Sequence, residues 1–142
     1  MIIADVNLLV SAFRSDHPMH EAAHRFLTSA MSDGGVTAPD LVWVGFFRLV
    51  TNRRIFPVPA RLDEAVAFAR AVTGSPGYRP VAGLSDGFER FYTVASRAFA
   101  TDNLVPDAYI ASAALSLGCP VATFDRDFHR FDGLTVIDPT GS

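Results

Sequence analysis

The stretch VPDAYIASAALSLGCPVATFD, residues 105–125, contains the pattern on which the rest of the chain is built. Pro106 and Asp107 are typical of a helix start, and the alanine-rich run behind them predicts a helix that ends at Gly118. Residues 121–124 are apolar and form a short buried-strand candidate that ends at Asp125. A helix that leads directly into a buried strand is typical of an α/β domain.

The same alternation continues toward both ends of the chain. Strands are predicted over residues 2–6, 36–38, 79–82 and 134–137. Further helices are predicted from Pro18 to Gly34, from Pro39 to about Thr51, across residues 62–72, and over 85–99 with Ser85 as N-cap. Strands separated by helices indicate a single domain over residues 1–142, an α/β/α three-layer fold with a short, mostly parallel central sheet.

Composition narrows the class of protein. Hydrophobic residues make up 49% of the 142 residues and charged residues 19%, which excludes a disordered chain. A single cysteine allows no internal disulfide, as expected in a reducing cytoplasm. The start MIIADVN lacks the basic and apolar regions of a signal peptide, and the longest apolar stretch, residues 42–47, is far shorter than the roughly 20 residues that span a bilayer. We therefore expect a cytoplasmic protein without a membrane partner.

The charged residues are unusually uniform. All 12 basic residues are arginine and 12 of the 15 acidic residues are aspartate. Aspartate favours caps, turns and metal sites over helix surfaces, so clustered carboxylates are to be expected. A base bias of the genome explains the missing lysines equally well. The net charge of -3 does not decide the partner, because an acidic metal site would itself supply several negative charges.

Four aspartates occupy two kinds of position. Asp5 and Asp125 each follow a short apolar strand, and Asp40 and Asp107 each follow a proline at a helix start. In a parallel sheet both positions lie at the carboxyl edge, where ligands bind. Four carboxylates would repel one another there unless a divalent cation neutralised them, and oxygen-only ligands favour Mg²⁺ or Mn²⁺ over Zn²⁺.

Each aspartate also has a purely structural interpretation. Asp40 and Asp107 would then be ordinary helix-end acids, and Asp5 and Asp125 ordinary turn residues. No single position separates the two interpretations. Four aspartates in compatible positions favour the metal site.

Four segments carry a resemblance to a known family: ADVNLLVSAF (4–13), PDLVWVGFFRLVTNRRIF (39–56), NLVPDAYIASAALSLG (103–118) and ATFDRDFHRF (122–131). Together they resemble a PIN-domain ribonuclease of the VapC toxin type, over nearly the whole chain. The resemblance implies that the metal ligands and catalytic acids are Asp5, Asp40, Asp107 and Asp125. It implies that three neighbouring polar residues support them: Asn7, Thr123 and Asp127.

The resemblance also implies an activity and partners. A VapC-like protein is the toxin of a type II toxin–antitoxin pair, a Mg²⁺-dependent endoribonuclease that cuts structured RNA with a metal-activated water. A small VapB-like antitoxin blocks its cleft, and the toxin is usually a homodimer.

Asp40 departs from the family pattern, which more often has glutamate there. Aspartate is one methylene shorter and would reach a metal only through water, so Asp5 and Asp107 become the firmest direct ligands. The departure leaves open an alternative: a catalytically weak or inactive PIN domain that acts as an antitoxin-binding regulatory module. A third possibility, a small-molecule phosphatase, would need a catalytic lysine that this chain lacks.

Other side chains suggest contacts with RNA and antitoxin. Five arginines have two interpretations, since they either bind RNA phosphates or are simply exposed to solvent: Arg48, Arg53, Arg54, Arg126 and Arg130. His129, between Phe128 and Phe131, is more typical of packing than of a general base, and Trp43 and Cys119 of packed positions. The 12 phenylalanines predict an apolar groove for an antitoxin helix, alternatively a larger core, with the groove formed by Phe13, Phe47 and Val50.

Overall fold

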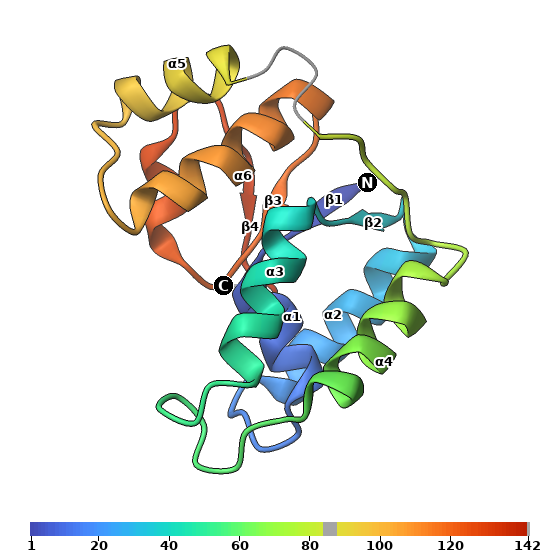
Figure 1. Cartoon of the computed structure of the whole chain (residues 1–142). Coiled ribbons are helices and arrows are strands. Elements are labelled where there is room, and N and C mark those ends of the chain that lie inside the picture. Colours follow the sequence, from blue (N-terminus) through green and yellow to red (C-terminus); the bar gives the residue numbers. More distant parts are fainter. Residues whose placement is uncertain (84–87, 142) are drawn as a thin grey trace.

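A computed structural model describes residues 1–83 and 88–141 of the chain. In chain order its elements are β1 (Ile2–Ala4), α1 (Val6–Phe13), α2 (His20–Ser32), β2 (Val36–Thr37), α3 (Asp40–Val50), α4 (Leu62–Thr73), α5 (Glu89–Arg97), α6 (Leu104–Leu117), β3 (Val121–Ala122), the 3-10 helix η1 (Arg126–Arg130) and β4 (Val136–Ile137). Figure 1 shows the short strands between two groups of helices.

The central sheet has the strand order β2-β1-β3-β4, and every pair is parallel. Ile3 of β1 lies opposite Thr37 of β2 on one side and Val121 of β3 on the other. The predicted α/β fold with a parallel sheet is therefore confirmed. Because all strands point the same way, their carboxyl ends form one edge, with β1 and β3 at its centre and β2 and β4 at its margins.

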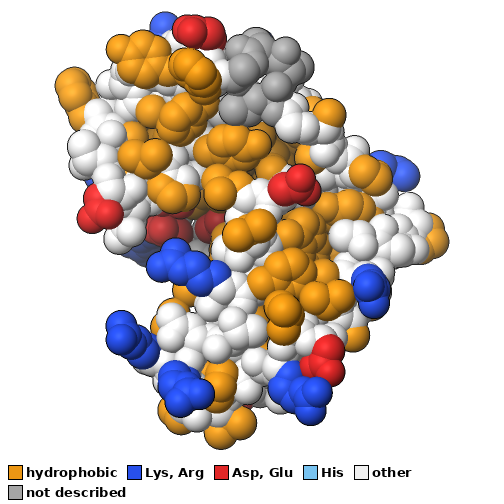
Figure 2. Space-filling model, viewed as in Figure 1, with side chains coloured by type: hydrophobic (Ala, Val, Ile, Leu, Met, Phe, Trp, Pro, Cys, Tyr) orange, Lys and Arg blue, Asp and Glu red, His pale blue; other side chains and the backbone are white. Residues whose placement is uncertain are grey.

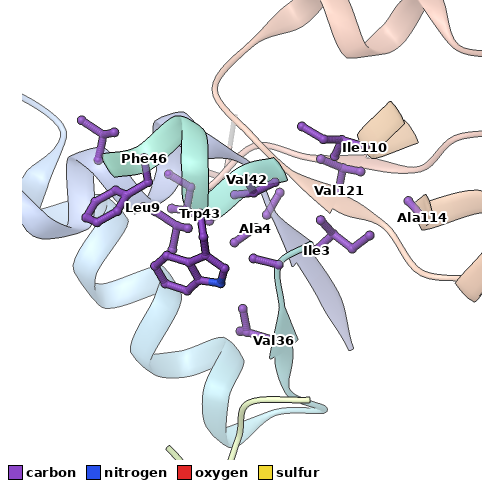
Figure 3. Packing of buried hydrophobic residues seen from close by; sticks show 14 of the residues in the cluster. Ile3, Ala4, Leu9, Val36, Val42, Trp43, Phe46, Ile110, Ala114 and Val121 are labelled. Atoms are coloured by element: carbon purple, nitrogen blue, oxygen red, sulfur yellow. The ribbon is translucent and has the colours of Figure 1, made fainter. Parts of the chain in front are cut away.

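Helices cover both faces of the sheet, because successive strand residues point to opposite sides. Ile3 and Val121 point toward α6, which also packs against α5 (Figure 3). Ala4 and Val36 point to the other side, where Trp43 of α3 lies (Figure 3). On that side α1 contacts both α2 and α3, and α3 contacts α4.

Helix α1 was not predicted, since the residues after Asp5 were interpreted as a turn. Asp5 is in fact the N-cap of α1, and its carboxylate accepts a hydrogen bond from the N–H of Val6. Five consecutive residues of this helix are buried, from Leu8 to Ala12. The local signal for this helix is Asp5 itself, because aspartate is a favoured N-cap residue.

Two further predictions need correction. The strand predicted over residues 79–82 is wrong: only Tyr78 forms a bridge, with Val36, and Pro80, which has no N–H, follows two residues later. The predicted helix over 85–99 begins later, because α5 starts at Glu89 with Phe88 as its N-cap, and Ser85 lies outside the described residues. Phe99 lies beyond its end, with a φ of 54°.

Of the three residues predicted to form an apolar groove, Phe13 and Phe47 are half-buried. Val50 is completely buried, and Phe13 packs edge-on against Phe46 and Phe68 in an aromatic cluster between α1, α3 and α4. Exposed apolar side chains lie elsewhere, on α3, α5 and α6, and are called here the exposed apolar band: Leu41, Val44, Tyr92, Val105 and Leu117. Figure 2 shows hydrophobic side chains gathered on the front face of the molecule. In the part of the chain that the structure describes, no helix is long and apolar enough to cross a bilayer.

Candidate active site

Asp5 is held at the end of β1 by three hydrogen bonds. Its N–H donates to the carbonyl of Ala122 at 3.1 Å, which places it beside the end of β3. One carboxylate oxygen accepts from the N–H of Val6 and the other from the hydroxyl of Thr123, both at 2.7 Å. The residue is only 5% exposed. Asp5 is thus a buried carboxylate with a fixed orientation.

Thr123 connects the two central strand ends. Besides donating to Asp5, its hydroxyl oxygen accepts from the side-chain amide of Asn7 at 3.1 Å and from the N–H of Asp125 at 2.9 Å. Asn7 also accepts from the N–H of Phe124 at 3.2 Å. The supporting positions expected for Asn7 and Thr123 are therefore seen as contacts, and they tie Asp5 to Asp125.

Asp107 completes a group of acids at this edge. Burial raises its pKa to about 7, and the negative charges of Asp5, Asp125 and Asp127 contribute further. The pKa of Asp5 is also raised, mainly by burial and further by Asp125, while the hydrogen bonds from Thr123 and Val6 oppose the shift. Four carboxylates are therefore close enough to act on one another electrostatically.

Asp40 stands apart from this group. It is the first residue of α3, its side chain is exposed, and it is not among the charges that raise the pKa of Asp107. It follows β2, so it does lie at the carboxyl edge of the sheet, as predicted. The structure thus brings Asp5, Asp107 and Asp125 together and leaves Asp40 at the margin.

A tyrosine that sequence analysis did not single out holds the start of α3. The hydroxyl of Tyr78 accepts from the indole N–H of Trp43 at 3.1 Å and donates to the carbonyl of Ala38 at 3.0 Å. Trp43 is 8% exposed, in agreement with the packed position expected for it. The role of Tyr78 depends on its contact with Trp43, which lies 35 residues away in the sequence, so no local pattern could have indicated it.

The acidic group suits a hard divalent cation by its chemistry. Its donors are all carboxylate and hydroxyl oxygens, and burial together with the neighbouring negative charges raises the pKa of Asp107 to about 7, a cost that a bound cation would relieve. Among residues 1–83 and 88–141, no three Asp, Glu, His or Cys side chains form a ready-made metal site. The donor types fit Mg²⁺, although the side chains would have to move to bind it together.

The surroundings of the acids are open and partly basic. A cavity of about 280 Å³ is lined by Thr123, Asp125, Arg126 and His129. His129 is exposed there instead of packed between its phenylalanine neighbours. Figure 2 shows acidic side chains recessed in a hollow, with a basic side chain at its rim. A phosphate-bearing ligand could approach through this opening.

Comparisons with known proteins identify the family of this chain. The PIN domain family model matches residues 2–134. Ribonuclease VapC31 of Mycobacterium tuberculosis is 38% identical over 98% of this chain and 99% of its own length.

Two solved structures share the fold. One, described as M. tuberculosis VapC20, a Sarcin-Ricin loop cleaving toxin, has a TM-score of 0.70 at 20% identity and covers 91% of this chain and 93% of its own. The other, VapBC2 from Rickettsia felis bound to a DNA fragment from their promoter, has a TM-score of 0.71 at 14% identity and covers 96% of this chain and 97% of its own. This chain belongs to the PIN domain family, within which its relatives are VapC ribonucleases.

Proposed function

We propose that this chain is a Mg²⁺-dependent endoribonuclease and the toxin of a type II toxin–antitoxin pair. The observation that carries the proposal is the half-buried Asp107, set among Asp5, Asp125 and Asp127 at the carboxyl edge of the sheet. A structural role does not require four mutually repelling acids at one place. The relatives named as VapC ribonucleases support the choice of RNA as substrate.

Asp5, Asp107 and Asp125 would hold Mg²⁺, or Mn²⁺ in its place, and Asp40 would help through a water molecule. The metal supplies a water of lowered pKa for hydrolysis of a phosphodiester. Thr123 keeps one oxygen of Asp5 occupied, so that this carboxylate cannot rotate freely. Arg126 lines the adjacent cavity and would bind a phosphate of the RNA.

Structured RNA is the substrate class that we infer. The five arginines proposed to bind phosphate are all exposed: Arg48, Arg53, Arg54, Arg126 and Arg130. Arg48 lies on α3, Arg53 and Arg54 lie on the loop after it, and Arg126 and Arg130 lie on η1, whose N-cap is Asp125. Positive side chains beside an acidic centre let an anionic strand approach despite the net charge of -3.

The exposed apolar band supports a protein partner. Val44 of α3 is 62% exposed, and Leu41, Val105 and Leu117 are each more than a third exposed. A band of this kind is typical of a surface that another chain covers. We propose that a VapB-like antitoxin and a second copy of this chain share it, in place of the groove expected around Phe13.

The activity is tested with purified chain and structured RNA. We expect cleavage in Mg²⁺, none in EDTA, and none by Asp107→Asn. Asp132→Asn is the matched control, because Asp132 is an exposed acid that is not among the charges acting on Asp107. Equal cleavage by the Asp107→Asn variant and the wild type would overturn the proposed site.

The alternative, a catalytically weak or inactive antitoxin-binding module, is favoured by two observations. Asp40 stays outside the acidic group, and no ready-made metal site exists among the described residues. A wild-type chain that binds its antitoxin but cleaves no RNA in Mg²⁺ or Mn²⁺ would establish this alternative.

A further inference from the structure

Helix α2 begins with the sequence His20-Glu21-Ala22-Ala23-His24, which the acidic site does not use. Two histidines four residues apart lie on one face of a helix, and the pattern H-E-x-x-H on a helix is a known arrangement for holding Zn²⁺. The two imidazole rings are 5.8 Å apart between centroids. His20, Glu21 and His24 line one open hollow on the surface.

The tautomer of His20 is determined by its partner. Its Nδ1 lies 2.9 Å from the carbonyl oxygen of Ser11, in the last turn of α1. A carbonyl can only accept, so Nδ1 carries the hydrogen and a neutral ring has its lone pair on Nε2. A carbonyl partner of this kind orients metal-binding imidazoles in proteins. His20 is thus prepared to bind a metal through Nε2.

His24 supplies the second nitrogen. It is exposed, so its ring can turn toward an ion at Nε2 of His20 without disturbing the core. His17 is different, because its Nδ1 already accepts a hydrogen bond from the N–H of Met19 at 3.0 Å. The segment therefore offers one suitable pair of imidazoles and a neighbouring histidine that serves as a comparison.

We propose that His20 and His24 form a second metal site, specific for divalent transition metals such as Cu²⁺, Ni²⁺ and Zn²⁺. Imidazole suits these ions, whereas Mg²⁺ prefers oxygen ligands. No third His, Cys, Asp or Glu among the described residues completes the site. A hydrolytic zinc centre needs three protein ligands, so this is a binding site with water in the remaining positions.

The bound ion stabilises the contact between α1 and α2. His20 already links the two helices through Ser11, and an ion that binds only the folded chain shifts the folding equilibrium toward it. Transition metals should therefore raise the melting temperature through a site separate from the acidic group of Asp5, Asp107 and Asp125.

The test uses the full chain and Cu²⁺, the ion that nitrogen sites bind most tightly. Electron spin echo modulation detects the remote nitrogen of a bound imidazole, which carboxylates and the amine of Met1 do not produce. We expect this signal in the wild type. In His24→Ala the signal should be reduced and Cu²⁺ should bind at least about tenfold more weakly. His17→Ala and Asp107→Asn should keep the wild-type signal.

Melting curves with and without Zn²⁺ provide the second measurement. The wild type and His17→Ala should gain stability, and His24→Ala should gain little. If His24→Ala keeps the wild-type copper signal and affinity, or if the wild type shows no imidazole signal, the proposal is wrong. Neither result depends on RNA cleavage, so the second site and the ribonuclease can fail independently.

Discussion

β1 and β2 are both parallel strands followed by an aspartate, but the surroundings of their carboxyl ends differ. The end of β1 lies between two neighbouring strands, so Asp5 is buried and receives hydrogen bonds from both its own helix start and Thr123. The end of β2 lies at the margin of the sheet, and Asp40 beyond it is exposed. The position of a strand in the sheet, and not the residue type at its end, determines how strongly its carboxylate is desolvated.

Metal binding should distinguish these two strand ends most clearly. Asp5→Asn and Asp107→Asn each remove a negatively charged carboxylate from the acidic group. We therefore expect the affinity for Mg²⁺ or Mn²⁺ to fall by more than about a hundredfold, which exceeds the effect of losing a residue that only supports a ligand. Asp40→Asn should reduce affinity far less. Isothermal titration of the three variants measures the difference, and unchanged binding in both Asp5→Asn and Asp107→Asn would exclude the acidic group as a metal site.

The role of Asp40 is tested by turnover at saturating metal. A carboxylate that acts through water orients the nucleophile, so Asp40→Asn should nearly abolish RNA cleavage, while Asp40→Glu should restore or raise it. Circular dichroism checks that both variants fold. Equal cleavage by both variants and the wild type would mean that Asp40 only stabilises the start of α3, an effect of roughly 0.5 to 2 kcal/mol.

Thr123 makes the end of β1 dependent on the end of β3. Thr123→Val removes the hydroxyl that donates to Asp5 and leaves that buried carboxylate oxygen without its hydrogen bond. We therefore expect a loss of about 1 to 3 kcal/mol in the free energy of unfolding. Cleavage should fall by about 10- to 100-fold. Thr123→Ser keeps the hydroxyl and should behave like the wild type. Chemical denaturation and cleavage rates together test this, and a fully active, stable valine variant would contradict it.

The pH dependence of stability should be the smallest effect. The pKa of Asp107 is about 7 in the folded chain against 3.8 in the unfolded chain, so the folded state holds the proton more tightly. The resulting stability is fully present below about pH 4 and is lost as the pH rises through 7. In metal-free buffer, the melting temperature of Asp107→Asn should therefore decline less between pH 4 and 7 than that of the wild type. Parallel curves for the two proteins would argue against the shift.

Local patterns were sufficient for most of the architecture. The predictions correctly located three strands, β1, β2 and β3, and two helices, α3 and α6. Caps and apolar periodicity involve residues close together in the sequence, so they can be recognised without the structure. The predicted strand at 79–82 was wrong because Pro80 has no N–H with which to continue the bridge between Tyr78 and Val36 of β2. Helix α1 was missed because Asp5 has two local interpretations, a turn residue after a strand and the N-cap of a helix, and the structure shows the second.

Strand ends and helix starts depend on neighbouring residues, so the aspartates that follow the strands and begin the helices can be identified from the amino-acid order. Which of these aspartates meet depends on the tertiary structure. The placement of β1 and β3 at the centre of the sheet brings Asn7 and Thr123 into contact across 116 residues and buries Asp5 beside them. Desolvation and charge repulsion depend on distance in space, and only the order of strands in the sheet sets that distance.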